Sequence, residues 1–571
     1  MKWLAVLCVV LASPLSSFSL DREAFAFTKY ELEVQVEPEQ QRLAVRGSIT
    51  LRNDSPVPQK NATVQLSSSL TWRSIQARGK PLQFVSQPYT SDIDHTGELS
   101  EAIVSLPSEI VPGGTIDLAI GYEGVIVLDA TRLTRIGIPK ETAMHSDWDQ
   151  ISSASSAVRG VGNVVWYPVS TEAASLSEGN SLFETLGRWK QREGNAEMRV
   201  RVRRSTEGSS SSMLWCNGKN ITVEDAASST VMAAVDCSLV PLRLDVPTFV
   251  LANYQMLDRP ALQIAYRPEH KSNAENFAKA AETATPFVIE WFGAPREKIR
   301  VAELFDAGAA PFESGILLLT PLGDTDAKLL EIALVHELTH AAFSSNRPWV
   351  YEGVAHFSQA AYRERQVNRA TALDFLGLHL SGIVAAEKAN ATRPKDSAAQ
   401  DQALINASVD EFYRSKAAYV WWMLRDMVGE EVLKKALANY RPDQDTDAAY
   451  VQHLIEAQAK RDLQWFFDDW IYHDRGLPDF RVESAFPRQA SQGNYLVTVT
   501  VENLGSAGAE VPVTVHFDGG ELSDRVEVRA KSKGVIRIAT PKRPLEIVVN
   551  DGSVPESEMS NNSFKVVSSP Q

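Results

Sequence analysis

The sequence predicts a multidomain α+β protein with an N-terminal antiparallel β domain, a mainly helical domain and a C-terminal β-sandwich. Apolar and polar residues alternate near both ends of the chain, as in strands with one solvent-facing side, whereas helical spacing dominates the middle. The 571 residues also exceed what one hydrophobic core accommodates, because domains commonly have roughly 100–200 residues. We therefore expect three such domains after any targeting segment.

The beginning of the chain has the features of a secretory signal peptide. Lys2 precedes an apolar run, residues 3–12, which is too short to span a bilayer. Small residues at 17 and 19, on either side of Phe18, suit cleavage, so we predict a signal peptide over residues 1–19 and a secreted, periplasmic or extracellular location. The alternative is an uncleaved anchor. No later segment is long and apolar enough to cross a membrane, so no integral span is expected after signal removal.

The first predicted domain covers residues 20–255. Leu32, Val34 and Val36 alternate with polar residues, and the same period-two pattern recurs over 43–52 and 116–122. This periodicity predicts antiparallel strands with one wet face.

Two cysteines remain after signal removal, Cys216 and Cys237, on either side of a predicted strand–turn–strand. In an oxidising compartment, one disulfide between them is the expected state. Two buried thiols in a sheet are the alternative, because spacing alone cannot show that the side chains meet.

The second predicted domain, residues 256–485, is mainly helical. Its apolar residues follow helical spacing in five stretches: 273–292, 326–343, 348–364, 410–440 and 447–473. Alternation returns after Pro487, where short strands separated by Gly, Asn and Pro turns predict a β-sandwich over residues 486–571.

Composition narrows the possible partners. The formal net charge is −15, whereas nucleic-acid-binding proteins carry basic patches. No nucleic-acid partner is expected. An acidic surface mainly supports solubility and says little about a substrate.

The most informative segment runs from residue 331 to 357, EIALVHELTHAAFSSNRPWVYEGVAHF. His336 and His340 are four positions apart, which on a helix places both imidazoles on one face. That helix, capped by Asp324 or Thr325, would be apolar nearly all round and therefore buried. Buried polar side chains need partners, and a metal ion would satisfy both rings.

Zinc suits this pattern, because catalytic zinc usually has three protein ligands and one open position. Glu352 is the predicted third ligand, on a second helix that begins at Pro348 and returns beside the first. His356, one turn later, is the alternative ligand. Glu337 neighbours His336 and is predicted to be the general base that accepts a proton from the attacking water.

At these residues the chain resembles the gluzincin aminopeptidases, the aminopeptidase N and leukotriene A4 hydrolase family. The similarity covers most of residues 25–482 and rests on HELTH, WVYEGVAHF and the tail WFFDDWIYHDRGLPDFRV. The resemblance implies a thermolysin-like peptidase domain over 256–485 with one zinc ion. It also implies that Glu313, in GAAPFESGILLLTP, binds the α-amine of a peptide substrate, and that Tyr413 stabilises the oxyanion.

The sequence departs from the family pattern at several places. The gap between His340 and Glu352 is shorter by roughly two helical turns, a loss that keeps the facing of the second helix. Only the glutamate is kept around Glu313, so an ordinary strand-edge residue is the alternative there. Tyr413 is one residue out of register with the Lys-Gly that follows it in the family. Tyr419, or no tyrosine, is the alternative.

The C-terminal domain also departs from the large aminopeptidases. Its last segment, NDGSVPESEMSNNSF, resembles bacterial adhesion-type immunoglobulin-like domains, and a generic polar hairpin is the alternative. Such a module would bind a surface partner or stabilise the chain. The leading hypothesis for the whole protein is a zinc aminopeptidase acting on extracytoplasmic peptides. The alternatives are a zinc endopeptidase and an inactive, zinc-stabilised binding or adhesion protein.

Overall fold

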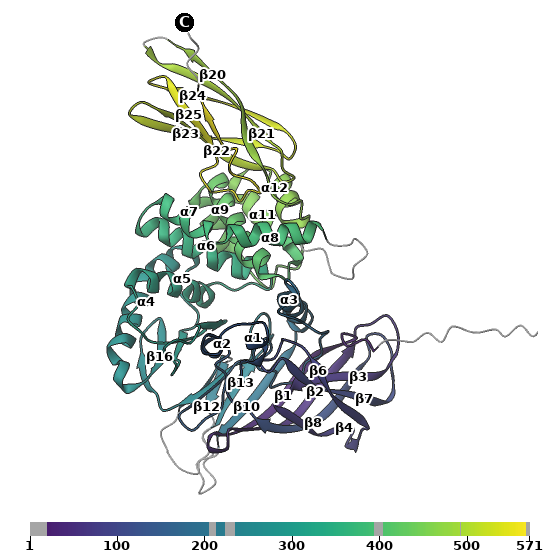
Figure 1. Cartoon of the computed structure of the whole chain (residues 1–571). Helices are drawn as coiled ribbons and strands as arrows, with labels where there is room; N and C mark the ends of the chain where they lie inside the picture. The colour runs from purple at the N-terminus through teal and green to yellow at the C-terminus, as the bar shows by residue number, and fades with distance from the viewer. Residues whose placement is uncertain are drawn as a thin grey trace, which may run out of the picture.

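The computed structural model describes residues 20–204, 213–217, 219–222, 234–392, 403–490 and 493–566. The predicted signal peptide lies outside the described residues. Three parts follow one another along the molecule: a β-rich part, a helical part and a small C-terminal sandwich (Figure 1). This arrangement confirms the multidomain α+β fold class. Among the described residues, no helix combines the length and the apolar character that a membrane span needs.

The N-terminal part is built on an eight-stranded sheet with strand order β12-β13-β10-β1-β2-β8-β4-β5. Its strands are β1 (Phe25–Glu37), β2 (Arg42–Asn53), β4 (Leu70–Ala77), β5 (Lys80–Pro81), β8 (Thr115–Val125), β10 (Glu197–Arg204), β12 (Lys219–Thr222) and β13 (Ala234–Leu239). Most neighbours are antiparallel, as predicted. The β1–β10 pair is parallel, because the chain returns to β1 through a long crossover that contains α3 (Ser181–Glu193).

Two small sheets and two short helices complete this part. One sheet consists of β3 (Gln59–Ser67), β7 (Glu98–Ile110) and β6 (Phe84–Thr90). The other consists of β11 (Met213–Cys216), β14 (Phe249–Ala252) and β9 (Ser155–Val158). The short helices are α1 (Thr131–Arg135) and α2 (Lys140–Ser146). The sequence analysis predicted none of α1, α2 and α3, because all three lie inside a region where strand periodicity dominates.

The helical part begins with a five-stranded sheet of order β15-β16-β17-β19-β18. Its strands are β15 (Gln255–Asp258), β16 (Leu262–Tyr266), β17 (Ile299–Glu303), β18 (Phe312–Ser314) and β19 (Leu317–Thr320), and α4 (Lys271–Phe292) crosses from β16 to its parallel neighbour β17. Sequence analysis found only the segment that contains β18 and β19. The central strands lack alternation because both of their faces are covered, as in parallel sheets generally.

Two helices follow the sheet, α5 (Ala327–Ala342) and α6 (Pro348–Gln366), close to their predicted bounds. The predicted caps of α5, Asp324 and Thr325, are wrong. Asp326 caps the helix, because its carboxylate accepts hydrogen bonds from the backbone N–H groups of Lys328 and Leu329 at 2.9 and 3.2 Å.

The remaining helices are shorter than the sequence indicated. They are α7 (Arg369–Gly377), α8 (Leu380–Ala391), α9 (Ala417–Val428), α10 (Glu430–Asn439), α11 (Tyr450–Ala459) and α12 (Gln464–Phe467), with π-helical turns at Glu411–Lys416 and Asp468–Tyr472. The stretch predicted as one helix over 410–440 is interrupted at Gly429, which has a φ of 88°. Glycine adopts this left-handed backbone without the steric cost that a side chain would add.

Seven strands form the C-terminal sandwich. One sheet contains β20 (Phe480–Gln489), β21 (Tyr495–Asn503) and β24 (Lys533–Thr540), and the other contains β23 (Gly520–Val528), β22 (Ala509–Phe517), β25 (Pro544–Val549) and β26 (Ser563–Lys565). The first strand begins at Phe480, six residues before the predicted boundary at 486. The polar segment at residues 550–564 folds back onto the start of β20. Its Glu556 accepts hydrogen bonds from the Phe480 backbone N–H and from the side chains of Asn550 and Asn562.

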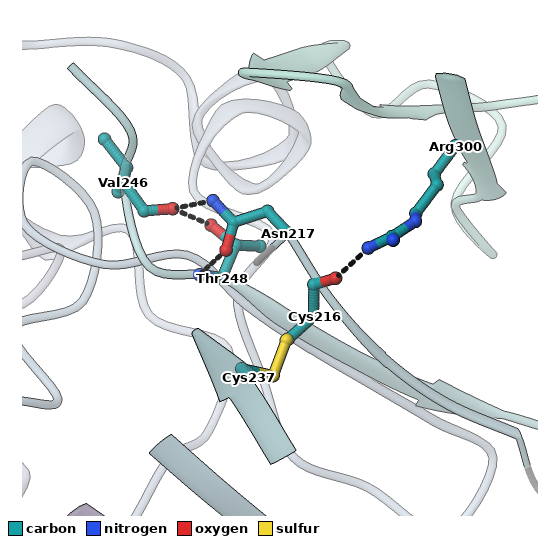
Figure 2. The surroundings of a disulfide bond; sticks show 6 residues. All are labelled: Cys216, Asn217, Cys237, Val246, Thr248 and Arg300. Carbon is teal, nitrogen blue, oxygen red and sulfur yellow. Dashed lines mark hydrogen bonds between the residues drawn. A yellow bond between two sulfur atoms is a disulfide. The ribbon is translucent and has the colours of Figure 1, made fainter. Parts of the chain in front are cut away.

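A disulfide joins β11 to β13 where the N-terminal part meets the sheet of the helical part. Cys216 and Cys237 are bonded with their Cα atoms 6.3 Å apart, and Arg300 of β17 donates to the Cys216 carbonyl at 3.1 Å (Figure 2). The adjacent Asn217 donates to the Val246 carbonyl at 2.8 Å (Figure 2) and to the Ser314 hydroxyl at 3.0 Å. The bridge therefore lies next to contacts that hold β18.

We expect the paired change Cys216→Ser and Cys237→Ser to lower the free energy of unfolding by roughly 3 kcal/mol, the amount typical for a closed loop of this length. Urea unfolding followed by tryptophan fluorescence measures the effect. Either single serine variant should lose as much as the pair, because both remove the same bridge. An unchanged urea midpoint for all three variants would show that the bridge contributes nothing.

Candidate metal centre

Helix α5 places two imidazoles on one face. His336 and His340 are buried, their ring centroids are 4.6 Å apart, and their Nε2 atoms are 3.0 Å apart. Burial lowers the pKa of His336 to about 4 and the pKa of His340 well below its usual range. Both rings are therefore neutral near pH 7, and a neutral imidazole has one nitrogen with a free lone pair for a metal.

Helix α6 brings a carboxylate to the same point. Glu352 Oε2 is 3.8 Å from His336 Nε2, and Glu352 Oε1 is 3.6 Å from His340 Nε2. The next residue, Gly353, allows α6 to approach α9 closely, because a Cβ there would lie 2.6 Å from the Cβ of Ala417. Glycine at 353 therefore permits the close packing of α6 against α9.

The three donor atoms fit a tetrahedral ion. Zinc ligands about 2.0–2.2 Å from the metal would lie roughly 3.3–3.6 Å from one another at tetrahedral corners. The two imidazole nitrogens are 3.0 Å apart, and they lie 3.8 and 3.6 Å from the two different carboxylate oxygens of Glu352, which is close to that range. Two neutral imidazoles and a buried carboxylate are also the donor types that zinc prefers. The predicted ligands His336, His340 and Glu352 therefore meet at one point with suitable chemistry.

His356 is the competing ligand. It lies on α6 one turn after Glu352, and its ring centroid is 4.8 Å from that of His336. Donor atoms of His336, Glu352 and His356 all lie within 4.8 Å of one another. The four-residue spacing of His336 and His340 on α5 and the 3.6 Å approach of His340 Nε2 to Glu352 favour the first set, with His356 as the neighbouring alternative. Both His356 ring nitrogens are buried and make no hydrogen bond with a described residue.

Glu337, next to the candidate ligand His336 in the sequence, is buried, and one of its carboxylate oxygens has no partner among the described residues. Its Oε2 atom makes no hydrogen bond to any part of the chain that the structure describes. Burial, together with the nearby Glu352 carboxylate, raises the pKa of Glu337 to about 8. A carboxyl whose pKa lies close to neutrality can both accept and return a proton, which is the requirement for a general base.

A cavity of about 350 Å³ opens onto the ligands. It is lined by both ligand histidines, Glu352, Glu313 and Tyr413, and by residues that sequence analysis missed: Lys190, Asp245, Tyr351, Asp410 and Arg414. Lys190 and Asp245 come from the N-terminal part, so two domains form its wall. No pattern around either residue could have signalled this. Tyr351 stacks on the His340 ring, with centroids 4.0 Å apart, and adjoins Glu352 in the segment already singled out.

Glu313 lies on the edge strand β18 and faces this cavity. Its Oε1 atom is 3.5 Å from His336 Nε2, and its side chain is 37% exposed. The carboxylate is therefore beside the candidate ligands, where the amine of a bound peptide could reach it. In this structure its partner is Arg414.

Tyr413 lines the same cavity from the π-helical turn Glu411–Lys416. A π-helix holds an additional residue in one turn and occurs often at functional sites. The additional residue in this turn accounts for the one-residue register difference between Tyr413 and the family pattern. The Tyr413 hydroxyl donates to Asp410. Tyr419, the alternative, is buried in α9 and is absent from the described lining of this cavity.

Arg414 connects the acidic groups of the cavity. Its Nε donates to Glu352 Oε2 at 3.1 Å, its Nη2 donates to Glu313 Oε1, and its Nη1 is 3.8 Å from Asp410 Oδ2. The side chain is 26% exposed, and burial lowers its pKa to about 10. It therefore remains a cation near pH 7 and contacts three carboxylates at once.

Comparison with known proteins yields solved structures only. No protein-family model matches the sequence, and no curated protein matches it. The chain is similar to the M1 zinc metallopeptidase from Deinococcus radiodurans, at 16% identity and a TM-score of 0.46 over 80% of this chain and 95% of that one. A mutant of that enzyme gives the same identity and TM-score over 81% and 97%. Both neighbours are described as M1 zinc metallopeptidases.

Proposed function

We propose that the protein is a zinc-dependent metallopeptidase that hydrolyses peptide bonds at the centre formed by His336, His340 and Glu352. The observation that carries this proposal is the buried carboxylate of Glu337, whose Oε2 atom has no hydrogen-bond partner among the described residues, next to the converging side chains of His336, His340 and Glu352. A structural zinc site normally fills all four positions with protein and has no use for such a carboxylate. This argues against an inactive, zinc-stabilised binding protein.

One zinc ion per chain would supply a Lewis acid that polarises the peptide carbonyl and acidifies a water molecule. Glu337 would accept the proton of the attacking water and return it to the leaving nitrogen. Tyr413 would donate a hydrogen bond to the developing oxyanion, which is worth a few kcal/mol in sites of this kind. For this its hydroxyl must turn from Asp410 toward the substrate.

The proposed substrates are extracytoplasmic peptides, with an aminopeptidase as the leading mode. Glu313 supports this mode, because its carboxylate stands in the cavity wall within reach of a substrate amine. An endopeptidase is the second candidate, and the ion pair between Arg414 and Glu313 favours it, because a neutralised Glu313 holds an amine less well. The features of a signal peptide support a secreted or periplasmic location, and the C-terminal sandwich remains a proposed binding module for a surface partner.

We expect Glu337→Gln to keep the zinc and to lower kcat by about 10²- to 10⁴-fold, the usual contribution of a general base. Metal content and hydrolysis of an aminoacyl amide measure the two effects. Glu331→Gln is the matched control on the same helix, because Glu331 contacts Tyr362 and Gln366 and not the ligands. Full activity of the Glu337 variant would contradict the proposed role.

Because the pKa of Glu337 is raised, the folding stability of the metal-free protein should depend on pH. A folded-state pKa of about 8, against an ordinary value of 4.5, means that the folded protein holds this proton more tightly than the unfolded chain. Stability is therefore fully present below about pH 4.5 and is lost as the pH rises toward 8, by up to roughly 1.4 kcal/mol per pH unit. Thermal unfolding with a chelator should show that Glu337→Gln gains stability over wild type as the pH rises from 5 to 8. A constant difference between the two proteins would contradict this assignment.

The aminopeptidase mode has its own test. Glu313→Gln should raise KM for an aminoacyl amide about 10-fold, because a charge-assisted hydrogen bond contributes about 1.5–3 kcal/mol. The N-acetylated form of a dipeptide amide is the control substrate, because it has no ammonium for Glu313 to bind. Equal loss on both substrates would point to the endopeptidase.

A further inference from the structure

Arg414 pairs with the carboxylate that the proposed aminopeptidase mode assigns to the substrate ammonium. Glu313 Oε1 already accepts a hydrogen bond from Arg414 Nη2, so an ammonium that approaches Glu313 meets a carboxylate whose charge is partly neutralised. The same guanidinium is held from a second side by Glu352, through the 3.1 Å contact to Nε. Arg414 is thus an internal cation bound to the only carboxylate that the proposed aminopeptidase mode assigns to the amine.

The charges around this arginine explain why it rests there. Asp410 also faces the guanidinium, with Nη1 and Oδ2 3.8 Å apart, so three carboxylates share one cation. Charge-assisted hydrogen bonds of this kind are roughly twice as strong as neutral ones. Lys190, the other cation in the described lining of the cavity, attracts the Glu352 carboxylate through its charge but makes none of these direct contacts. The direct contacts are therefore those of Arg414.

The backbone supports this position. Arg414 follows Tyr413 within the π-helical turn Glu411–Lys416, where five-residue spacing replaces four-residue spacing. Both side chains line the cavity, although they are adjacent in sequence. In a regular α-helix, adjacent residues diverge by about 100°.

We propose that Arg414 is a specificity-determining residue that competes with the substrate's α-ammonium for Glu313. A peptide with a free N-terminus must compete with the guanidinium for the charge of Glu313, whereas an internal or N-acylated segment leaves the pair intact. The wild-type centre therefore binds free amines less tightly than it would without Arg414. This inference rests on the proposed function, because it assigns Glu313 to the amine.

The test measures binding, so that it does not depend on turnover. Zinc-loaded Glu337→Gln protein is the background, and L-leucinamide and N-acetyl-L-leucinamide are the probes in titration calorimetry. Adding Arg414→Met should strengthen leucinamide binding about 10-fold, a typical gain when a competing charged hydrogen bond is removed. Binding of the acetylated probe should stay unchanged. Arg414→Lys, which keeps the cation, should resemble the parent.

A double-mutant cycle separates competition from a structural effect. In the Glu313→Gln background, Arg414→Met should no longer strengthen leucinamide binding, because the shared carboxylate is gone. Zinc content is measured for every variant, since Arg414 also contacts Glu352. Equal changes for both probes, or a gain that persists without Glu313, would overturn the proposal. Peptidase activity is measured separately on the wild-type protein: an inactive wild type would refute the proposed function, whereas the binding cycle tests only the competition between Arg414 and an ammonium for Glu313.

Discussion

The convergence of two helices on one point governs the rest of the site. Helix α5 supplies His336 and His340 one turn apart, and α6 supplies Glu352, with the donor atoms 3.0–3.8 Å from one another. Because both histidines are buried and neutral, a metal ion is the partner that satisfies them together. Every other assignment depends on this geometry, since Glu337, Glu313 and Tyr413 have roles only in relation to a metal bound there.

Around these donors the protein concentrates carboxylates that are costly to bury. Burial raises the pKa of Glu337 and of Glu352 to about 8. Without an ion, the site is held by protonation and by the cation of Arg414. A divalent ion would favour the ionised form of the carboxylates nearest to it, because opposite charges within about 4–6 Å lower a carboxyl pKa. Metal binding and proton release are therefore linked at this centre.

Much of the metal centre could be predicted from the sequence, because the periodicity of a helix is local. Two local signals indicated the candidate ligands: the four-residue spacing of His336 and His340, and the proline that opens α6. The long-range contributions were not predictable. Lys190 and Asp245 reach the cavity from another domain, and the position of Arg414 depends on a π-helical turn that no simple pattern signals. The central strands β16 and β17 were missed because, with both faces covered, they show no alternation.

The assignment is tested most directly by an anomalous difference map at the zinc edge, measured on crystals of the zinc-loaded protein. We predict a single peak within bonding distance of His336 Nε2, His340 Nε2 and one carboxylate oxygen of Glu352. Glu337 should lie nearby without bonding to the metal. A peak bonded to His356 in place of His340, a fourth position filled by Glu313, or no peak at all would contradict it.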